Sequence, residues 1–545
     1  MSLPVPSRGD EDRTLKVLSL NVWGLAFISK DRPPRIKAIA EYLATTHYDV
    51  VCLQEIWIYK DFEIVREEVL QNLPFSRFFH TPMPSGALGS GLAIFTRYPL
   101  ISAMALPYSL SGTPQKFVDG DFFVNKAAAN VVILHPLLGE VEIWNTHMHA
   151  AGEAPPDTRQ AHRIAQSWQL ANQVRSGAAK GRYVLVMGDF NSQPFSVPIA
   201  IMRSHGELSD SFVDAHPYAN TSSGRPVSPE NGVTLHGMTC DSPLNTYSHG
   251  KPIPAEITSK GGKRLDYIFY RQPEVARRRP LIWGYRDEGG DGNIGAGAGA
   301  AIRDGVDGAL EQGKPLPHSL QRAPVLRCAK SEVVLTGRVP GKPFSYSDHF
   351  GLSSTFVVDS PASSRSGAGT SGNPTESEPS RHSTESSADK NSFTPLVPLM
   401  SEPEAINPTT TTFALPELPR SPPTSPRASS SLPHAPKSSI LRTALATLRD
   451  YTAISRRNRL LHLRLSAAAV VILLGLTIGS AWQPKSYIQP IFTLLAAVLG
   501  GAGATFFYLG FLWGKWEEGL LTEVREEMEL ELRVVEVEER ATRSA

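Results

Sequence analysis

Polar side chains that could bind a metal ion or move a proton follow several short apolar runs in this 545-residue sequence. The run 183–187 ends at Gly188 and is followed by Asp189 and Asn191. Other apolar runs lead to further candidates of the same types: Asn21, Glu55, His147, Asp266, Asp348 and His349. Carboxylate and amide oxygens suit Mg²⁺, and a neutral imidazole suits general base catalysis. We therefore expect metal-assisted attack of water on a phosphoester.

Each of these residues has a simpler explanation when it is taken singly. Gly, Asp and Asn are the commonest turn formers, so Asp189 and Asn191 could simply turn the chain. A lone histidine such as His147 is more often a hydrogen-bonded structural residue, and a lone Glu55 more often a solvated one. The sequence has no Cys/His zinc spacing, no Walker loop and no G-x-S-x-G motif. The whole set, and not one member, indicates the hydrolytic site.

The elements that must position these residues are strands interspersed with helices. Apolar alternation and short apolar runs predict strands at 15–21, 50–55, 92–96, 130–134, 141–144, 183–187, 264–270 and 352–357. Helical spacing predicts helices at about 34–45, 61–71 and 158–174. This order predicts an α/β or α+β domain over residues 15–359, of which we expect the α+β class, after an N-terminal tail of residues 1–14. Inside it the Gly/Ala-rich stretch 289–308 has no periodicity, and we expect a mobile surface insertion there.

Composition excludes some classes of partner. Lys+Arg 54 against Asp+Glu 53 gives a net charge of +1, so no global field recruits nucleic acid and we expect no nucleic-acid partner. The three cysteines, Cys52, Cys240 and Cys328, are few and widely separated, which argues for a reducing compartment rather than a disulfide framework. Residues 1–13 are polar and lack the apolar core of a secretory signal peptide.

The C-terminal part of the chain changes character. Residues 360–436 are rich in Ser, Pro and Thr, and too few are apolar to offset the entropy of ordering, so we expect a disordered linker. A basic segment, 437–464, precedes two apolar runs, 465–482 and 488–513, each close to the roughly 20 residues that cross a bilayer. They predict a transmembrane hairpin. The alternative is two buried core helices, but no other helices nearby could bury them. The acidic tail 514–545 has helical spacing but alternates like a strand from Met528, so its form stays open, with a solvated, partly amphipathic helix as the favoured outcome.

The distribution of basic residues orients the predicted hairpin. Arg456, Arg457, Arg459 and Arg464 precede the first apolar run, and Lys515 follows the second. The positive-inside rule then places both termini and the α+β domain in the cytosol, with the chain as a multi-pass protein of the endoplasmic reticulum or another endomembrane. Anionic lipid is the partner expected near the basic segment.

Five motifs occur in a recognisable order: Gln54-Glu55, Thr146-His147, Gly188–Ser192, Leu265–Tyr267 and Ser347–His349. Over about residues 15–357 they resemble the motifs of the endonuclease/exonuclease/phosphatase superfamily. The resemblance implies a four-layer α/β sandwich. Within the superfamily the chain is similar to the neutral sphingomyelinases and to the fungal inositol phosphosphingolipid phospholipases C, which have a similar C-terminal hairpin.

One further segment carries the same resemblance. Residues 120–128 resemble the Asp…Lys segment of the membrane-bound neutral sphingomyelinases, which implies that Asp121 and Lys126 take part in activity and in a conformational switch. Without the resemblance they are two surface charges in a turn.

The resemblance implies a role for each candidate. Glu55, with Asn21, would hold Mg²⁺, and His349 would be a general base positioned by Asp348.

Four other residues would act on the phosphate. Asp189 and Asn191 would orient the water and the phosphate. His147, supported by Asp266, would stabilise the pentavalent transition state or assist the leaving group.

The substrate implied by the resemblance is a membrane sphingolipid, either sphingomyelin or an inositol phosphosphingolipid, cleaved to ceramide and a phosphorylated headgroup. Three alternatives stay open: an inositol polyphosphate phosphatase, an AP-endonuclease-like nuclease of the same fold, and a non-catalytic membrane scaffold.

Overall fold

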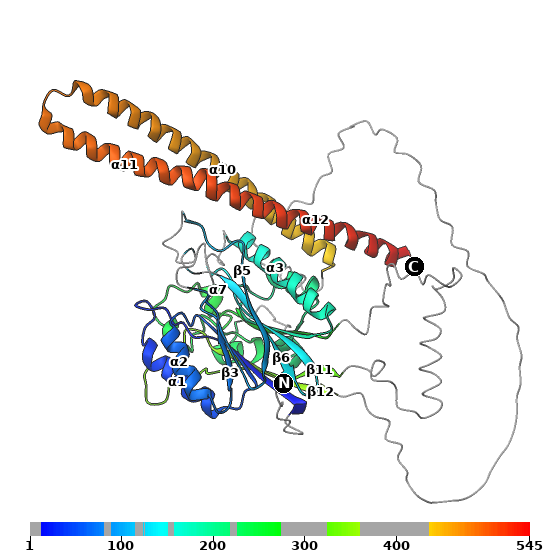
Figure 1. Cartoon of the computed structure of the whole chain (residues 1–545). Helices are drawn as coiled ribbons and strands as arrows, with labels where there is room; N and C mark the ends of the chain where they lie inside the picture. The colour runs from blue at the N-terminus through cyan, green and yellow to red at the C-terminus, as the bar shows by residue number, and fades with distance from the viewer. Residues whose placement is uncertain are drawn as a thin grey trace, which may run out of the picture. The chain divides into compact units, whose positions relative to one another are not determined.

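The structure is a computed structural model of the chain, drawn in Figure 1. It describes residues 12–80, 89–114, 126–150, 159–217, 226–273, 324–359 and 435–544, with Phe122, Val124 and Asp157. Asp121, the stretch 289–308 and nearly all of the predicted linker 360–436 lie outside the described residues. The expectations for those parts stay predictions.

The first sheet has the strand order β11-β12-β1-β2-β4-β3. Its strands are β1 (Thr14–Asn21), β2 (Val50–Gln54), β3 (Phe75–Phe78), β4 (Ala93–Thr96), β11 (Val325–Val334) and β12 (Gly351–Asp359). β1 and β2 are parallel, and the other neighbouring strands are antiparallel. Every residue of β2 is buried, as expected of a strand covered on both faces.

The second sheet has the order β5-β6-β7-β8-β10-β9. Its strands are β5 (Leu100–Pro107), β6 (Ala127–His135), β7 (Gly139–His147), β8 (Tyr183–Asp189), β9 (Ser209–Asp210) and β10 (Asp266–Arg271). Here β7 and β8 are the parallel pair, and the other neighbours are antiparallel. β8 contains the run with which the sequence argument began, and all of it is buried.

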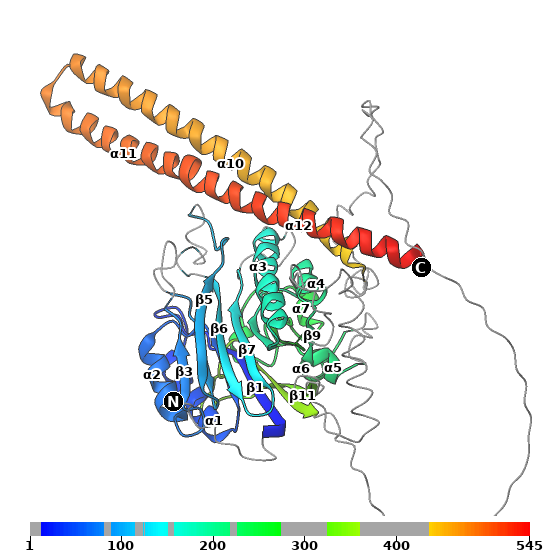
Figure 2. The same ribbon diagram turned by 45° about the vertical axis from the view of Figure 1, so that its right-hand side comes forward.

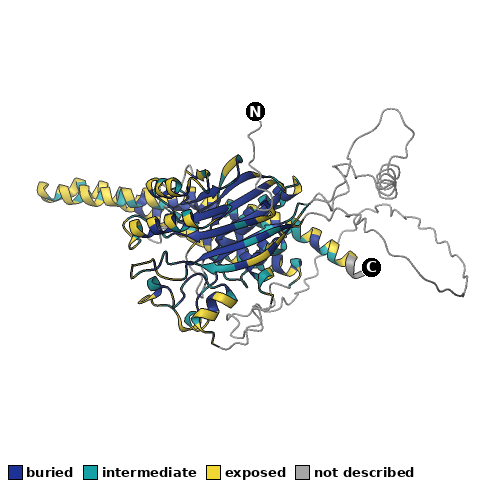
Figure 3. Cartoon of the chain, turned by 90° about the horizontal axis from the view of Figure 1, so that it is seen from below, coloured by how far each residue is buried: buried dark blue, intermediate teal, exposed yellow. Residues whose placement is uncertain are grey.

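The two sheets face each other, and helices lie on their outer faces (Figure 2). An apolar cluster between the sheets takes residues from both, such as Val17 and Ile143. α1 (Arg32–Thr45) and α2 (Tyr59–Val69) pack against the first sheet. α3 (Gln160–Ala179) and α4 (Val197–Ser204) pack against the second. Figure 3 shows the strands as the most deeply buried part of the molecule. The predicted α+β class is confirmed.

Short helices connect β9 to β10 along the chain. They are α5 (Ser211–Ala215), α6 (Pro229–His236), α7 (Ala255–Thr258) and a 3-10 turn at Thr246–Ser248.

Two buried amides join the sheets near the ends of β2 and β7. Gln54 Nε2 donates to Asn145 Oδ1 at 2.7 Å, and both side chains are fully buried. Asn145 Nδ2 in turn donates to the backbone oxygens of Leu53, at 2.9 Å, and Ala93, at 3.0 Å. A buried polar group must find its partners inside the protein, so these bonds fix how the second sheet sits on the first.

The C-terminal helices form a hairpin (Figure 1). α10 (Lys437–Gly479) ends in a 3-10 turn, and a second turn at Ser486–Ile488 leads into α11 (Gln489–Phe507). A π-helical stretch, Tyr508–Trp513, continues into α12 (Gly514–Ser544). Each arm has a stretch long and apolar enough to cross a membrane, and these stretches are only 11% and 6% buried. Such exposure argues against the alternative of two buried core helices.

The lower ends of α10 and α12 pack on the α+β domain. Leu445 and Leu448 of α10, with Leu521 and Met528 of α12, are buried in the same apolar cluster as Trp168 of α3. The expectation of a solvated tail is therefore wrong, although the tail is helical. The apolar side chains of α12 face α3, whereas the acidic composition of the tail suggested a helix surrounded by water.

Polar contacts reinforce the same packing. Trp168 Nε1 donates to Glu527 at 2.6 Å. Glu531 accepts from Lys437 at 2.6 Å and from Arg175 at 3.3 Å. His205 Nδ1 also lies 3.3 Å from Glu531 Oε1, and the hydrogen bonds with His205 first and Lys437 second lower the pKa of Glu531 by stabilising its charged form.

The inter-sheet junction can be tested by removing one amide. We expect Asn145→Ala to lower the free energy of unfolding by roughly 3 kcal/mol, because it leaves several buried groups without partners. The matched control is Asn130→Ala, since buried Asn130 donates a single bond within its own sheet, to Ile143 O at 3.2 Å. The measurement is denaturant unfolding of the detergent-solubilised protein by tryptophan fluorescence. Equal losses for the two variants would contradict this role for Asn145.

Candidate active site

The candidate residues converge because of the strand directions. Asn21 ends β1 and Glu55 follows β2, while His147 and Asp189 end the parallel strands β7 and β8. The carboxyl ends of parallel strands meet at one edge of a sheet, and an antiparallel strand begins at that same edge. Asp266 accordingly begins β10 directly opposite Asp189. His349 comes just before β12, which is antiparallel to β1.

Asn21 links two of the carboxylates. Its Nδ2 donates to Glu55 Oε1 at 2.9 Å and to Asp189 Oδ2 at 3.1 Å. Its Oδ1 accepts from the backbone nitrogen of Trp23 at 2.9 Å. Asn21 therefore presents its amide nitrogen to the site, which differs from the predicted role as an oxygen ligand. In this arrangement it orients Glu55 and Asp189.

Two site residues have left-handed backbones. Glu55 has φ 59° and Asn191 has φ 46°. Such conformations are uncommon for residues other than glycine and gather at functional sites, where the surrounding structure enforces them. Asn191 is held on both sides: its backbone nitrogen donates to Asp189 Oδ1 at 2.9 Å, and its Nδ2 donates to Met148 O at 3.0 Å.

His349 is positioned by Asp266. Its Nδ1 lies 2.9 Å from Asp266 Oδ2, and its Nε2 lies 3.9 Å from Asp189 Oδ2. The prediction that Asp348 positions His349 is wrong, since the Asp348 carboxylate instead lies 3.5 Å from Lys251 Nζ. The chain bends at Asp348, so its carboxylate points toward Lys251 while the ring of His349 points toward Asp266.

His147 is paired with Lys126 and not with Asp266, so that second pairing is also wrong. Lys126 Nζ lies 2.8 Å from His147 Nε2, and both side chains are buried. The same ring nitrogen is 3.6 Å from Asp189 Oδ2 and 3.8 Å from Glu55 Oε1. The register explains the change, because His147 is opposite Ala127 of β6, beside Lys126, whereas Asp266 is opposite Asp189.

Burial and mutual repulsion shape the charges. Burial raises the pKa of Asp189 to about 7, with opposition from His349 and a contribution from Asp266. Burial also raises the pKa of Glu55, and Asp348 adds to it. Burial alone would lower the pKa of His349, but Cys240, Asp266 and Asp189 together raise it well above 6.5. The site therefore favours positive charge among its carboxylates.

The donor set fits a hard divalent cation. Ligand atoms of Asp189, Asp266 and His349 lie within 4.8 Å of one another and could hold a metal ion. Asp266 Oδ1 is buried and makes no hydrogen bond within the described residues, so it is available to a cation. Glu55 extends the same set through its bond to Asn21. Carboxylate oxygens suit Mg²⁺, Mn²⁺ or Ca²⁺ rather than a thiolate-binding metal.

Sequence reasoning missed two neighbours of the histidines. Cys240 forms an isolated β-bridge with His349, and the Trp57 ring centroid lies 6.4 Å from that of His147. Cys240 lies in a loop without periodicity, and no motif marks Trp57. Of the predicted set, Asp348 contacts Lys251 and not a site histidine, although its charge acts on Glu55, while Asp121 lies outside the described residues.

A bound cation should stabilise the fold, because it relieves the repulsion between buried carboxylates. We expect millimolar Mg²⁺ or Mn²⁺ to raise the unfolding temperature of the wild-type protein, with a gain of about 2.7 kcal/mol when the ion is at a hundred times its dissociation constant. Glu55→Gln and Asp189→Asn should reduce that shift. Glu41→Gln is the control, since the side chain of Glu41 is 57% exposed on α1. An equal shift in all four proteins would rule out this site.

Comparison with known proteins gives the family. A model of the endonuclease/exonuclease/phosphatase family matches residues 18–349. Inositol phosphosphingolipids phospholipase C of Schizosaccharomyces pombe is 40% identical over 263 residues, covering 47% of this chain and 60% of that protein. Sphingomyelin phosphodiesterase 2 of Rattus norvegicus is 31% identical over 257 residues, covering 47% and 56%. The chain thus spans less than two thirds of the length of these two relatives.

A solved structure, sphingomyelinase C from Streptomyces griseocarneus, is 16% identical and matches with a TM-score of 0.37, over 63% of this chain and 99% of that one. The family model covers more than half of the chain and includes all five motifs, from Gln54-Glu55 to His349. The chain therefore belongs to the endonuclease/exonuclease/phosphatase family.

Proposed function

We propose that this protein is a Mg²⁺-dependent phospholipase C that hydrolyses membrane sphingolipids to ceramide and a phosphorylated headgroup. The observation that carries the proposal is the buried His349–Asp266 pair facing Asp189, which combines a general base with a place for a hard cation. The names of the two relatives support a sphingolipid phosphodiester as substrate.

In this proposal Glu55 and Asp189 hold the metal, and Asn21 keeps both carboxylates in place. Bound Mg²⁺ supplies charge stabilisation for the phosphate oxygens and for the leaving oxygen. The described structure offers these two carboxylates on adjacent sides of one amide, so neither can rotate without losing its bond to Asn21.

The proton of the attacking water would go to His349 in its neutral form, which a bound cation would favour by compensating the carboxylates that raise the pKa of the ring. Its Nδ1 is committed to Asp266, which leaves Nε2 as the accepting atom. Asp266 fixes the tautomer and the direction of the ring, and it stabilises the imidazolium that forms. Asp189, 3.9 Å from that Nε2, and Asn191 border the place where the water and the phosphate would be oriented.

The second histidine, His147, acts on the transition state and on the leaving group. The ammonium of Lys126 donates to His147 Nε2, so positive charge lies close to Asp189 and Glu55. Preformed charge of this kind stabilises a pentavalent phosphorane more than it stabilises the substrate. His147 would also assist the ceramide oxygen as it leaves, by passing to it a proton that the Lys126 ammonium supplies to the ring.

The rival functions of the same fold differ in what they release. A phosphatase would release free phosphate, a nuclease would nick a plasmid, and a scaffold would neither bind Mg²⁺ nor turn over. Two candidate membrane spans and a net charge of +1 favour the lipid substrate over nucleic acid.

Ceramide release tests the proposal and the corrected pairing together. His349→Ala and Asp266→Asn should each lower turnover about 10² to 10⁴-fold, as loss of a general base or of its orientation does. Asp348→Asn tests the pairing: it should lower turnover less than Asp266→Asn does, since Asp348 contacts Lys251 and not the imidazole and acts on the site only through its charge beside Glu55. Glu41→Gln, on the exposed face of α1, is the control that should leave turnover unchanged.

The assay offers detergent-solubilised protein both sphingomyelin and inositol phosphoceramide, with Mg²⁺ or a chelator, and identifies both products. Ceramide with intact phosphorylated headgroup supports the proposal, and the preferred headgroup is read from the same data. Absence of ceramide in every condition, or free phosphate as the product, would overturn it.

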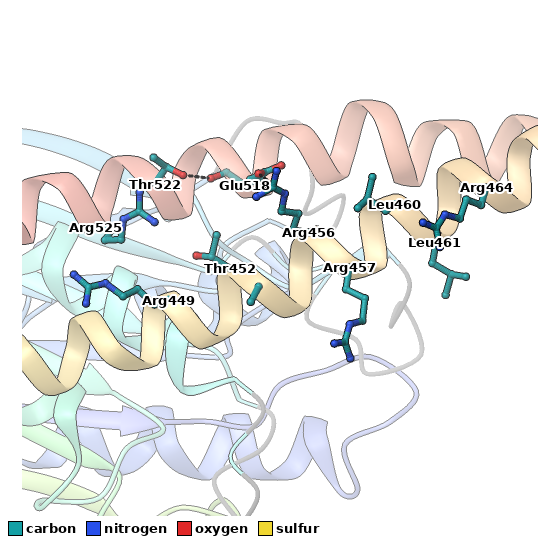
Figure 4. Close-up of a pocket in the computed structure, with 11 residues that line it drawn as sticks. Arg449, Thr452, Arg456, Arg457, Leu460, Leu461, Arg464, Glu518, Thr522 and Arg525 are labelled. Carbon is teal, nitrogen blue, oxygen red and sulfur yellow. Dashed lines mark hydrogen bonds and ion pairs between the residues drawn. The ribbon is translucent and has the colours of Figure 1, made fainter. Parts of the chain in front are cut away.

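The proposed place of action is the cytosolic face of the endoplasmic reticulum or another endomembrane, with both termini cytosolic. Support comes from arginines at the base of the hairpin. A cavity of about 800 Å³ between α10 and α12 is lined by Arg449, Arg456, Arg457, Arg464 and Arg525 (Figure 4). Arg456 and Arg449 are paired with Glu518 and Glu529, at 3.9 and 3.0 Å.

Arg457 and Arg464 have no carboxylate within 4.0 Å among the described residues, so they are the groups proposed to bind anionic lipid. We expect Arg457→Gln with Arg464→Gln to reduce the phosphatidylserine retained by the purified protein in mixed nanodiscs, by about 1 kcal/mol of binding per arginine. Arg442→Gln is the control, because Arg442 pairs with Glu536 at 2.7 Å. Unchanged retention, measured by lipid mass spectrometry, would exclude this lipid site.

A further inference from the structure

The loop that joins β1 to α1 is drawn in blue in Figure 1 and carries two apolar side chains that are exposed to solvent. Phe27 is 108% exposed and Ile28 is 69% exposed. Phe27 also has φ 66°, a left-handed backbone that bulky residues rarely adopt. Single exposed apolar residues are ordinary on protein surfaces. Two adjacent ones in a strained conformation need a reason, and we call this pair the apolar tip.

Arg35 holds the base of the loop on both sides. Its guanidinium is fully buried and donates to Val22 O and Trp23 O, each at 2.7 Å, where the loop begins. Its Nε donates to Lys30 O at 2.9 Å, where the loop ends. One buried side chain therefore holds the two ends of the loop together, and the apolar tip projects from a fixed base.

The same loop is joined to the candidate site. Gly24 N donates to Glu55 O at 2.9 Å, and Val22 N donates to Gln54 O at 2.9 Å. A Cβ atom at position 24 would lie 2.4 Å from Glu55 O, so only glycine allows this contact. Because the loop starts directly after Asn21, the apolar tip and the carboxylates belong to one connected unit.

We propose that the apolar tip inserts into the lipid interface and so holds the candidate site at the surface of the bilayer. The transfer of phenylalanine and isoleucine side chains from water to the acyl boundary of a bilayer is favourable in free energy. Lys30, exposed beside them, suits the anionic headgroup layer. The two candidate spans of the same chain keep a bilayer within reach of the domain at all times, which is why lipid and not a second protein is the partner.

The effect of insertion on hydrolysis rests on the proposed function, whereas insertion itself does not. Contact between the apolar tip and lipid requires no turnover, so it can be measured separately from hydrolysis. The chain also allows selective labelling, because Cys52, Cys240 and Cys328 are all buried.

The test uses the full chain in phosphatidylcholine vesicles with Phe27→Cys or Ile28→Cys labelled by an environment-sensitive fluorophore. Some vesicles contain lipid with a nitroxide on the acyl chain, and the nitroxide quenches only fluorophores that enter the membrane. The matched control is Lys37→Cys on α1, where the side chain is 75% exposed and lies outside the loop. We expect strong quenching and a blue shift at positions 27 and 28, and neither at position 37.

Several outcomes would overturn the proposal. One is quenching at positions 27 and 28 no greater than at 37. Another is a blue shift in detergent that depends on protein concentration and is not quenched by lipid, which would mean that a second copy covers the apolar tip. The quenching should persist with His349→Ala. A wild-type protein that is quenched but releases no ceramide argues against the proposed function and not against insertion.

A second measurement keeps the inference testable if labelling disturbs the loop. Phe27→Ser with Ile28→Ser should lower hydrolysis of vesicle substrate relative to detergent-dispersed substrate by about tenfold, the factor expected when partial burial of two apolar side chains is lost. The same ratio as in the wild-type protein would overturn insertion.

Discussion

The candidate site is divided between two sheets, so its geometry depends on how the sheets are held against each other. Asn21, Glu55 and His349 come from the first sheet, whereas His147, Asp189 and Asp266 come from the second. The apolar cluster between the sheets favours contact but is indifferent to small sliding motions. The hydrogen bonds of Gln54 and Asn145 are directional and resist such sliding, because a shift of about 1 Å would break them. Positional accuracy at the site thus begins with two neutral amides that do no chemistry.

Charge is the second determinant of the site. Glu55, Asp189 and Asp266 are brought close together in a buried place, which is unfavourable unless positive charge accompanies them. Lys126 and the two histidines supply part of that charge, and the raised pKa values of Asp189 and Glu55 show that it does not compensate fully. The protein retains an unfavourable arrangement that a divalent cation would relieve, as binding sites often do.

Much of the fold and the membership of the site could be predicted from the sequence. Apolar runs that end in polar residues located the strand ends, and the ends of parallel strands must meet. Pairing could not be predicted, because it depends on register: proximity in the chain favoured Asp348 as the partner of His349, whereas the sheet supplies Asp266.

Strands β3, β5, β9 and β11 were also absent from the predicted set. β5 exposes four successive residues, from Ile101 to Met104, and so has no buried run to recognise. The packing of α12 on α3 could not be predicted either, because a tertiary surface decides which face of an amphipathic helix is buried.

α10 runs without interruption from its contacts with α3 and α4 to the end of the first candidate span. A helix advances about 1.5 Å and turns about 100° with every residue. The number of residues between the segment that packs on α3 and the candidate span therefore sets two quantities. One is the distance of the span from the α+β domain along the helix axis, and the other is its rotation about that axis. A single inserted residue would rotate the docked face away from α3, whereas a loop would absorb the same insertion. Length in this stretch is consequently as constrained as residue identity is in the site.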